Sequence, residues 1–200
     1  MSQRGRRAIK GILIGLVLIA LVVGYYFYLS NRKPKEAAEG LTKTRKEFST
    51  ELAKLSKKYK NIDDDYPPTP REVLKLYSDI TVCFYSEDYT DEELTQLALQ
   101  IEKLYDEELI ANNTPDQYQK NLRWDIKTMK DKNLRVTSYS VASATDVDYF
   151  DAGGRSWARL SCTYTIRSGK EAGLAREIFL LRKDDMGHWK IYGWEAAKER

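Results

Sequence analysis

The sequence predicts an α+β protein: one N-terminal transmembrane helix, then three helices packed on one face of a four-stranded antiparallel sheet. Three observations carry this prediction. An uncharged run at residues 11–30 is long enough to cross a bilayer. Apolar residues then recur at helical spacing in three stretches between residues 69 and 129. After Asn133 apolar and polar residues alternate, which is the period of a strand with one buried face.

The uncharged run Gly11–Ser30 has the features of an uncleaved membrane anchor. As a helix it would be about 30 Å long, which matches the hydrocarbon core of a bilayer. Tyr25, Tyr26 and Tyr28 fall near its end, where tyrosine is enriched at the headgroup level, and no signal-peptide cleavage site follows. Residues 1–10 form a basic tail before it. We therefore expect a single-pass membrane protein.

Basic residues on the two sides of the anchor bear on its orientation. Three arginines and a lysine lie in residues 1–10, and six basic residues lie in residues 31–46. A bare count therefore points the C-terminal domain inward. A short arginine-rich tail is hard to translocate, however, and long domains cross largely regardless of charge. We expect a cytoplasmic N-terminus, an anchor in the cell membrane and an extracytoplasmic domain.

Residues 31–65 are predicted to be a charged linker that contains an amphipathic helix. Its apolar residues recur at intervals of seven, four, three, four and three, which places them on one stripe: Leu41, Phe48, Leu52, Leu55, Tyr59 and Ile62. Two interpretations are open. The helix either forms a coiled coil, which makes a homodimer through residues 41–62, or lies against its own domain. Pro67 and Pro68 end the helix, because the residue before a proline favours extended backbone.

Residues 66–200 are the predicted folded domain, and its three helices share one start signal. Thr69, Thr90 and Thr114 each stand at an N-cap position, with Glu or Gln three residues later. An apolar stripe follows each cap, and the second stripe extends to Leu109. The stripes are Val73, Leu76, Tyr77, Ile80 and Phe84; Leu94, Leu97, Ala98, Ile101, Leu104 and Leu109; and Tyr118, Leu122, Ile126 and Met129.

Four strands are predicted after the helices. The clearest alternation runs from Trp157 to Arg167 and places these residues on the inward face: Ala158, Leu160, Cys162, Tyr164 and Ile166. A less regular strand at residues 135–148 precedes it. Residues 178–181 are apolar on both faces, as in a central strand, and residues 189–194 form the last strand. Turns rich in Gly, Asp and Ser separate the strands.

Two resemblances add to this prediction. The order of helices before an antiparallel sheet whose last strand is rich in Trp and Tyr looks like the NTF2-like cone fold, which implies a curved sheet. Four stretches resemble an uncharacterised family of small single-pass membrane-anchored proteins of anaerobic Gram-positive bacteria, a domain of unknown function: Tyr66–Val73, Cys83–Tyr85, Leu104–Leu109 and Phe179–Lys183. This second resemblance implies the same anchor-and-domain plan and transfers no catalytic residue.

The sequence carries no motif for catalysis, metal binding or nucleotide binding. The net charge is +3, with acidic and basic residues interspersed, so no basic face is expected to bind nucleic acid. The single histidine, His188, has no second His or Cys near it to form a metal site. Glu108 could act as a base only if burial raised its pKa; a solvated helix face is the simpler interpretation. Cys83 and Cys162 fit core positions, with a disulfide as the alternative. We expect no catalytic residue, metal or cofactor.

Aromatic and arginine side chains are the remaining candidates for a binding site. In a cone fold, aromatic side chains of the sheet could line the mouth of a pocket, while Trp and Arg on the polar face suit a partner surface. The candidate residues are Trp157, Arg159, Tyr164, Arg167, Trp189, Tyr192 and Trp194. We expect a membrane-anchored extracytoplasmic binding module for a protein partner or a small apolar ligand. The alternative, a small NTF2-like isomerase- or hydrolase-type enzyme, requires a carboxylate and a donor that converge inside the sheet.

Overall fold

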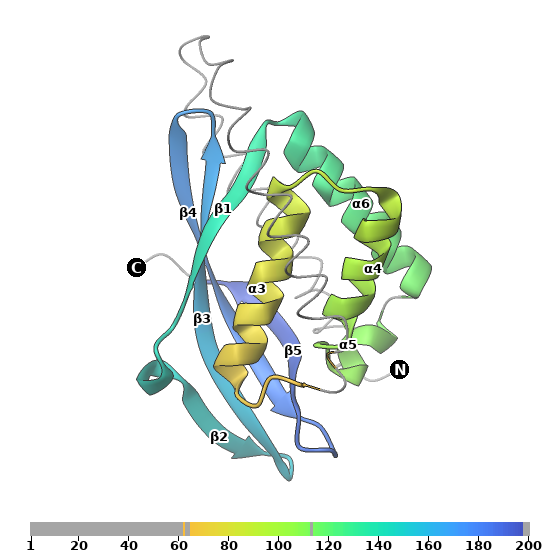
Figure 1. Ribbon diagram of the computed structural model, residues 1–200. Helices are drawn as coiled ribbons and strands as arrows, with labels where there is room; N and C mark the ends of the chain where they lie inside the picture. Colours follow the sequence, from red (N-terminus) through yellow and green to blue (C-terminus); the bar gives the residue numbers. More distant parts are fainter. Residues whose placement is uncertain (1–61, 63–64, 113, 198–200) are drawn as a thin grey trace.

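The computed structural model describes residues 62, 65–112 and 114–197, which form an α+β domain (Figure 1). Its elements are α3 (Pro70–Ser86), α4 (Asp91–Glu102), α5 (Glu107–Ala111), α6 (Pro115–Asp131), β1 (Leu134–Val141), η1 (Ala144–Asp146), β2 (Asp148–Ala152), β3 (Arg155–Ser168), β4 (Glu171–Lys183) and β5 (Trp189–Ala196). The predicted tail, anchor and linker helix lie outside the described residues, except for Ile62, which is 1% exposed in the core. Among the described residues, no helix has the length and apolar character needed to span a membrane.

The three predicted helix starts are confirmed. The hydroxyls of Thr69, Thr90 and Thr114 each accept a hydrogen bond from the amide three residues later, at 3.2, 3.2 and 3.3 Å. At Thr90 the carboxylate of Glu93 also accepts from the Thr90 amide, at 2.7 Å, which completes a capping box. These bonds satisfy amides that the first turn of a helix leaves unpaired, so the starts are fixed by local sequence.

The predicted end of the second helix is wrong. Helix α4 ends at Glu102, and the chain then runs along the edge of β5 before α5 begins. The Ile191 amide donates to the Leu104 carbonyl at 2.7 Å, and the Asp106 amide donates to the Ile191 carbonyl at 2.9 Å. These backbone bonds cover the edge of the last strand, which is a reason for the chain to leave the helix there. The residue that ended the predicted stripe, Leu109, is buried on α5 instead.

Within the described residues the sheet has five antiparallel strands, not the predicted four. Its order is β1-β3-β4-β5, and β2 pairs with the remaining part of β3. The strand predicted at residues 135–148 is divided, because β1 pairs with Cys162–Ser168 and β2 pairs with Arg155–Arg159 of the long strand β3. Between β1 and β2 the Ser143 hydroxyl donates to the Asp146 carboxylate at 2.7 Å, which stabilises the 3₁₀ turn η1.

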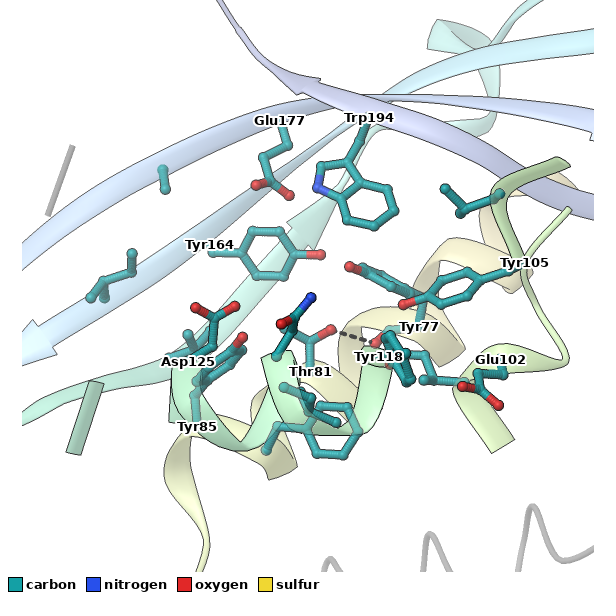
Figure 2. A pocket seen from close by; sticks show the side chains of 18 of the residues that line it. Tyr77, Thr81, Tyr85, Glu102, Tyr105, Tyr118, Asp125, Tyr164, Glu177 and Trp194 are labelled. Carbon is teal, nitrogen blue, oxygen red and sulfur yellow. Dashed lines mark hydrogen bonds between the residues drawn. The ribbon is translucent and has the colours of Figure 1, made fainter. Parts of the chain in front are cut away.

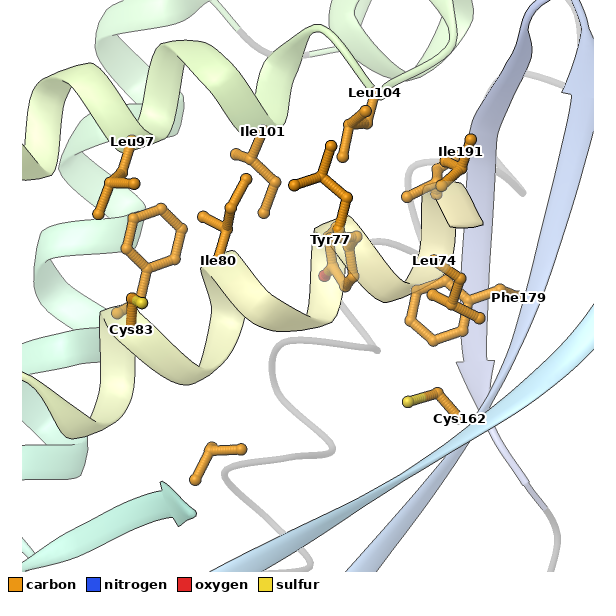
Figure 3. Packing of buried hydrophobic residues seen from close by; sticks show 14 of the residues in the cluster. Leu74, Tyr77, Ile80, Cys83, Leu97, Ile101, Leu104, Cys162, Phe179 and Ile191 are labelled. Atoms are coloured by element: carbon orange, nitrogen blue, oxygen red, sulfur yellow. The ribbon is translucent and has the colours of Figure 1, made fainter. Parts of the chain in front are cut away.

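The helices cover one face of the sheet, with α3 against the strands and α4 and α6 on its far side (Figure 1). The alternation predicted for β3 is confirmed: its five inward residues, from Ala158 to Ile166, are 0–8% exposed. Side chains of α3 and α4 meet those of β4 and β5 in the core (Figure 3). Its fully buried members include Leu74, Ile80, Ile101, Leu104, Phe179 and Ile191.

Both cysteines are part of this core. Cys83 is 2% exposed and Cys162 is 0% exposed, and no disulfide joins them. The Cys162 sulfur lies 3.5 Å from the hydroxyl of Ser78, a buried residue of α3. The predicted core positions are therefore confirmed, and the alternative disulfide is not formed.

Candidate functional site

An interior cavity of about 110 Å³ lies between the helices and the covered face of the sheet (Figure 2). All four described helices and strands β1, β3, β4 and β5 contribute to its wall. Its lining residues are Tyr77, Thr81, Phe84, Tyr85, Ile101, Glu102, Tyr105, Leu109, Ile110, Tyr118, Asn121, Leu122, Asp125, Val136, Tyr164, Ile166, Ala175, Glu177 and Trp194. Ile110 is 43% exposed, so the cavity approaches the surface beside α5. A mostly apolar cavity with a few polar groups is typical of small-molecule sites.

Aromatic rings from distant parts of the chain form much of the cavity wall. The tyrosines are Tyr77, Tyr85, Tyr105, Tyr118 and Tyr164, joined by Trp194. The Trp194 ring lies 5.8 Å from the rings of both Phe179 and Tyr77, so the core fixes its position. Burial raises the pKa of all five tyrosines, which therefore remain neutral hydroxyl groups.

The carboxyl group of Glu177 points into this cavity between Tyr164 and Trp194 (Figure 2). Glu177 lies on the inward face of β4 and is 4% exposed. No described residue forms a hydrogen bond or an ion pair with its side chain, and burial raises its pKa to about 8. Near neutral pH the group is therefore close to the balance between its protonated and ionised forms.

Two further carboxyl groups line the cavity, and no cationic group is found among its described lining residues. Burial raises the pKa of Asp125, on α6, to about 6, and burial also raises the pKa of Glu102, on α4. None of the described lining residues is a lysine, an arginine or a histidine. Because the whole chain has 33 Lys and Arg against 30 Asp and Glu, this one-sided lining does not follow from the composition.

Strand pairing explains how the sheet leaves space at this site. Tyr164 of β3 is paired with Ala175 of β4, whose small side chain leaves room above the sheet. Cys162 is paired with Glu177 in the same register. The Tyr164 hydroxyl lies 3.0 Å from the buried Ser78 hydroxyl, and this hydrogen bond holds the ring at the cavity wall.

The outer face of the sheet carries a different arrangement, which we call the Arg182 cluster: Arg182, Asp106, Glu108, Trp157 and Tyr192. The guanidinium group donates to the Asp106 carboxylate at 2.9 and 2.6 Å and to the Glu108 carboxylate at 2.8 Å. It also lies 5.5 Å from the Trp157 ring and 5.0 Å from the Tyr192 ring. Since Asp106 is the N-cap of α5, the cluster attaches α5 to the sheet.

The Arg182 cluster corrects the idea that Glu108 could be a base with a raised pKa. Its pKa is lowered, chiefly because Arg182 donates a hydrogen bond to it; the Tyr192 hydroxyl also donates, at 3.0 Å. The Glu108 side chain is 56% exposed. A carboxylate that an arginine holds in the ionised form is a weak proton acceptor, so Glu108 does not suit general base catalysis.

The structure places five of the seven candidate binding residues in two separate regions. Tyr164 and Trp194 line the cavity. Trp157 and Tyr192 belong to the Arg182 cluster on the outer face, where their rings meet at 5.0 Å in an edge-to-face contact. Arg159 is exposed on the same outer face. The cavity and the outer face are opposite sides of one sheet, so these residues do not form one site.

The other two candidates lie elsewhere. Trp189 is buried at the start of β5, where its ring lies 5.8 Å from the Tyr149 ring. Arg167 is on the same face of β3 as Arg159 but is exposed near the other end of the strand, away from the Arg182 cluster. His188, beside Trp189, is half-buried and stacks on the Tyr66 ring at 4.3 Å. Its position is explained by contacts within the domain.

Glu177, whose carboxyl group points into the cavity, is not among the residues predicted from the sequence. The period of the strand indicates its position. Phe179 and Leu181 are buried, and Glu177, two positions before Phe179, faces the same side of the strand. The predicted strand began at Ile178 and stopped one residue short. Asp125 and the helical tyrosines have no such signal, because only the fold brings them together.

Comparison with protein families decides which family the chain represents. The family model described as Domain of unknown function (DUF6715) matches residues 1–194. The chain belongs to this family. The predicted membership in an uncharacterised family is therefore confirmed, and the DUF6715 description names no activity. A search of curated proteins finds no relative.

Proposed function

We propose that this DUF6715 protein is a membrane-anchored, extracytoplasmic binding module whose interior cavity takes a small ligand. The observation that carries the proposal is Glu177, a buried carboxyl group without a described partner, in a cavity lined by aromatic rings. Burying such a group lowers stability unless something pairs with it. A polar group kept inside an apolar cavity at this cost is typical of a ligand site.

The fold supports the same proposal in a second way. We propose that the domain is of the NTF2-like cone type, in which helices close one face of a curved antiparallel sheet. Support comes from the order of elements in the described residues, where α3 to α6 precede the five strands, and from the cavity between the two layers. Proteins of this type often bind small apolar ligands there, which agrees with the aromatic lining.

The size of the cavity limits the ligand. An engineered cavity of about 150 Å³ in another protein admits benzene, which has six carbon atoms. The cavity here is about 110 Å³. The proposed ligand therefore has roughly four to six non-hydrogen atoms, unless part of it extends past Ile110 to the surface.

Cyclopentanone, a neutral and water-soluble molecule of about six non-hydrogen atoms, tests the cavity directly. Its binding to the full-length protein in a maltoside detergent can be measured by saturation-transfer NMR. We expect binding to the wild type and at least about tenfold weaker binding to Ala175→Leu, whose added side chain fills the cavity. The matched control, Ala172→Leu, adds the same atoms at an exposed position of β4 and should bind like the wild type. Equal binding to both variants, or none to the wild type, would contradict the proposal.

The membrane part of the proposal rests on residues 11–30 and on the arginines before them. Deletion of residues 1–30 should release the protein from membranes, measured by sedimentation after a high-salt wash. Protease added to intact, wall-stripped cells should digest the domain. Retention of the truncated protein on the membrane would refute the anchor, and protection of the domain would reverse the topology. The truncated protein retains residues 41–62. Its oligomeric state therefore tests whether these residues form the proposed homodimer without the anchor.

An isomerase-type enzyme is the second candidate, because a carboxyl group and hydroxyl donors converge in the cavity. The charge of Glu177 contributes to the raised pKa of Tyr77, Tyr85 and Tyr164, which places the four groups within one small volume. A base with a pKa near neutrality beside neutral hydroxyl groups suits proton abstraction next to a carbonyl. Exchange of the α-protons of cyclopentanone in D₂O tests this candidate. Exchange that the wild type accelerates and Glu177→Gln does not would favour the enzyme; equal rates would exclude this reaction for the probe.

A further inference from the structure

The charges that face the cavity restrict the chemistry of its ligand, if the cavity is the binding site proposed above. Glu177, Asp125 and Glu102 contribute three carboxyl groups, and no described lining residue is cationic. A ligand with a negative charge would meet only like charges. A ligand with one positive charge would supply the partner that Glu177 lacks within the described part of the chain.

The aromatic wall points to the same kind of ligand. Tyrosine and tryptophan faces attract cations, and cages of such rings are a recurrent way to bind ammonium groups. Here the rings of Tyr164 and Trp194 both lie next to the Glu177 carboxyl group (Figure 2). An ammonium group at this position would be paired with a carboxylate and lie beside aromatic rings, while its alkyl groups would contact the apolar wall.

We propose that the ligand is a small organic monocation, an alkylammonium whose charge lies between the Glu177 carboxylate and the rings of Tyr164 and Trp194. Binding then requires the ionised form of Glu177, so the cation competes with a proton for the same carboxyl group. One proton leaves for each cation that binds to the protonated protein. Affinity should therefore rise with pH until Glu177 is fully ionised in the free protein.

The titration of Glu177 can be distinguished from those of the titratable groups around it by its pKa. Helix α3 presents Tyr77 and Tyr85, strand β3 presents Cys162 and Tyr164, and burial raises the pKa of each. Burial also raises the pKa of Tyr105, which follows α4, and of Tyr118, on α6. The remaining carboxyl groups are Asp125, whose pKa is about 6, and Glu102, whose pKa is raised from 4.5. Of the described carboxyl groups in the wall, Glu177 has the pKa closest to 8.

Tetramethylammonium and tert-butanol form the matched pair of probes, since each has about five non-hydrogen atoms and only the first is charged. Their binding to the full-length protein is measured by competition with cyclopentanone at constant ionic strength between pH 6 and 9. At pH 9 we expect tetramethylammonium to bind at least about tenfold more tightly than tert-butanol. Its affinity should fall about fivefold from pH 8 to pH 7 and about ninefold from pH 7 to pH 6, while that of tert-butanol changes less than about twofold.

Two variants complete the test. Glu177→Gln should abolish the preference for the cation and retain the binding of cyclopentanone. Glu195→Gln, which changes an exposed carboxyl group on β5, should behave like the wild type. The pH profile of the wild type needs no variant, so it decides the question even if Glu177→Gln folds poorly.

The outcomes separate this inference from the proposed function. If cyclopentanone binds in the cavity but tetramethylammonium binds no better than tert-butanol at pH 9, the cation inference is overturned and the ligand-binding cavity stands. If none of the three probes binds to the wild type, both are overturned. A preference for tetramethylammonium that is independent of pH, or unchanged in Glu177→Gln, would also overturn the assignment of Glu177 as the partner of the cation.

Discussion

Two buried carboxyl groups of this domain, Asp106 and Glu177, have opposite surroundings. Asp106 is 2% exposed and receives two hydrogen bonds from Arg182, at 2.9 and 2.6 Å. Glu177 is 4% exposed and has no partner among the described residues. The first group completes a set of contacts that joins α5 to the sheet. The second remains available to something outside the described chain, which is why we place function at Glu177 and structure at Asp106.

The contrast between the surroundings of Asp106 and Glu177 also shows which aromatic residues indicate a binding site. Trp157 and Tyr192 surround Arg182, so their rings already have a cation from the same chain. Tyr164 and Trp194 surround Glu177, and no described cation lies among the residues of that wall. Aromatic rings around a complete ion pair stabilise the fold, whereas rings around an unpaired charge favour a ligand.

Removal of the arginine should have the largest effect on stability. Arg182→Ala leaves Asp106 buried without its partner, and breaking a buried pair in this way typically costs about 3–5 kcal/mol. Urea denaturation of the full-length protein measures the loss. Arg159→Ala is the matched control, because Arg159 pairs with Asp148 at 3.7 Å on the exposed outer face. We expect a change below about 1 kcal/mol for the control. Equal losses for the two variants would show that the Asp106 pair is not a structural contact.

Glu177 should make stability depend on pH in a defined direction. Its pKa is raised from 4.5 to about 8 in the folded protein. Between these values the folded protein retains a proton that the unfolded chain releases, so the free energy of unfolding falls as the pH rises. From pH 5 to pH 8 this decrease should be on the order of 3 kcal/mol for the wild type.

Glu177→Gln removes the titrating group and should remove this part of the pH dependence. Parallel urea denaturation series of the two proteins at pH 5, 6.5 and 8 measure the difference between them. The variant should gain stability relative to the wild type as the pH rises. Parallel curves at all three pH values would mean that Glu177 is solvated or already paired.

Trp157→Ala should have a smaller effect than Arg182→Ala. Trp157 lies on the outer face of the sheet, but its ring contacts Phe150 at 6.3 Å and Tyr192 at 5.0 Å. The loss of these contacts should cost about 1–2 kcal/mol, measured by urea denaturation. Trp124→Ala, on the exposed side of α6, is the control and should change stability by less than about 0.5 kcal/mol. A loss above about 4 kcal/mol for Trp157→Ala would place this ring in the core.

Asp125→Asn should have the smallest effect. Burial raises the pKa of Asp125 from 3.8 to about 6, so the wild type should lose stability as the pH rises between these values. Because Asp125 is only partly buried, we discount the effect for solvent screening to below about 1 kcal/mol. A comparison of the two proteins at pH 4 and pH 7 measures it. A larger effect than that of Glu177→Gln would move the centre of the site to α6.

The parts of the fold that could be predicted from the sequence depend on neighbours along the chain. Thr69, Thr90 and Thr114 cap helices through bonds to amides three residues away, and β3 alternates because one of its faces is buried. The errors involve distant partners. The second helix stops because the chain after it pairs with Ile191, and the first strand divides because β3 is long enough to pair with two segments.

The candidate site was harder to predict than the fold, for the same reason. Tyr164 and Trp194 were among the predicted residues because they lie in strands rich in aromatic side chains. Glu177 follows the period of β4 and could have been found by extending that strand by one residue. The cavity itself depends on side chains from all four described helices, and no local pattern states that they meet.

The most direct test of the central claim is the titration of Glu177 itself. Carbon-13 NMR of the side-chain carboxyl group in the full-length protein, with the signal assigned by its loss in Glu177→Gln, gives the midpoint. We predict a midpoint near 8 in the free protein, because the group is buried without a partner. Saturating tetramethylammonium should move the midpoint down toward the usual range of glutamate, since a bound cation favours the ionised form. A midpoint near 4.5 in the free protein, or one that the cation leaves unchanged, would contradict the account.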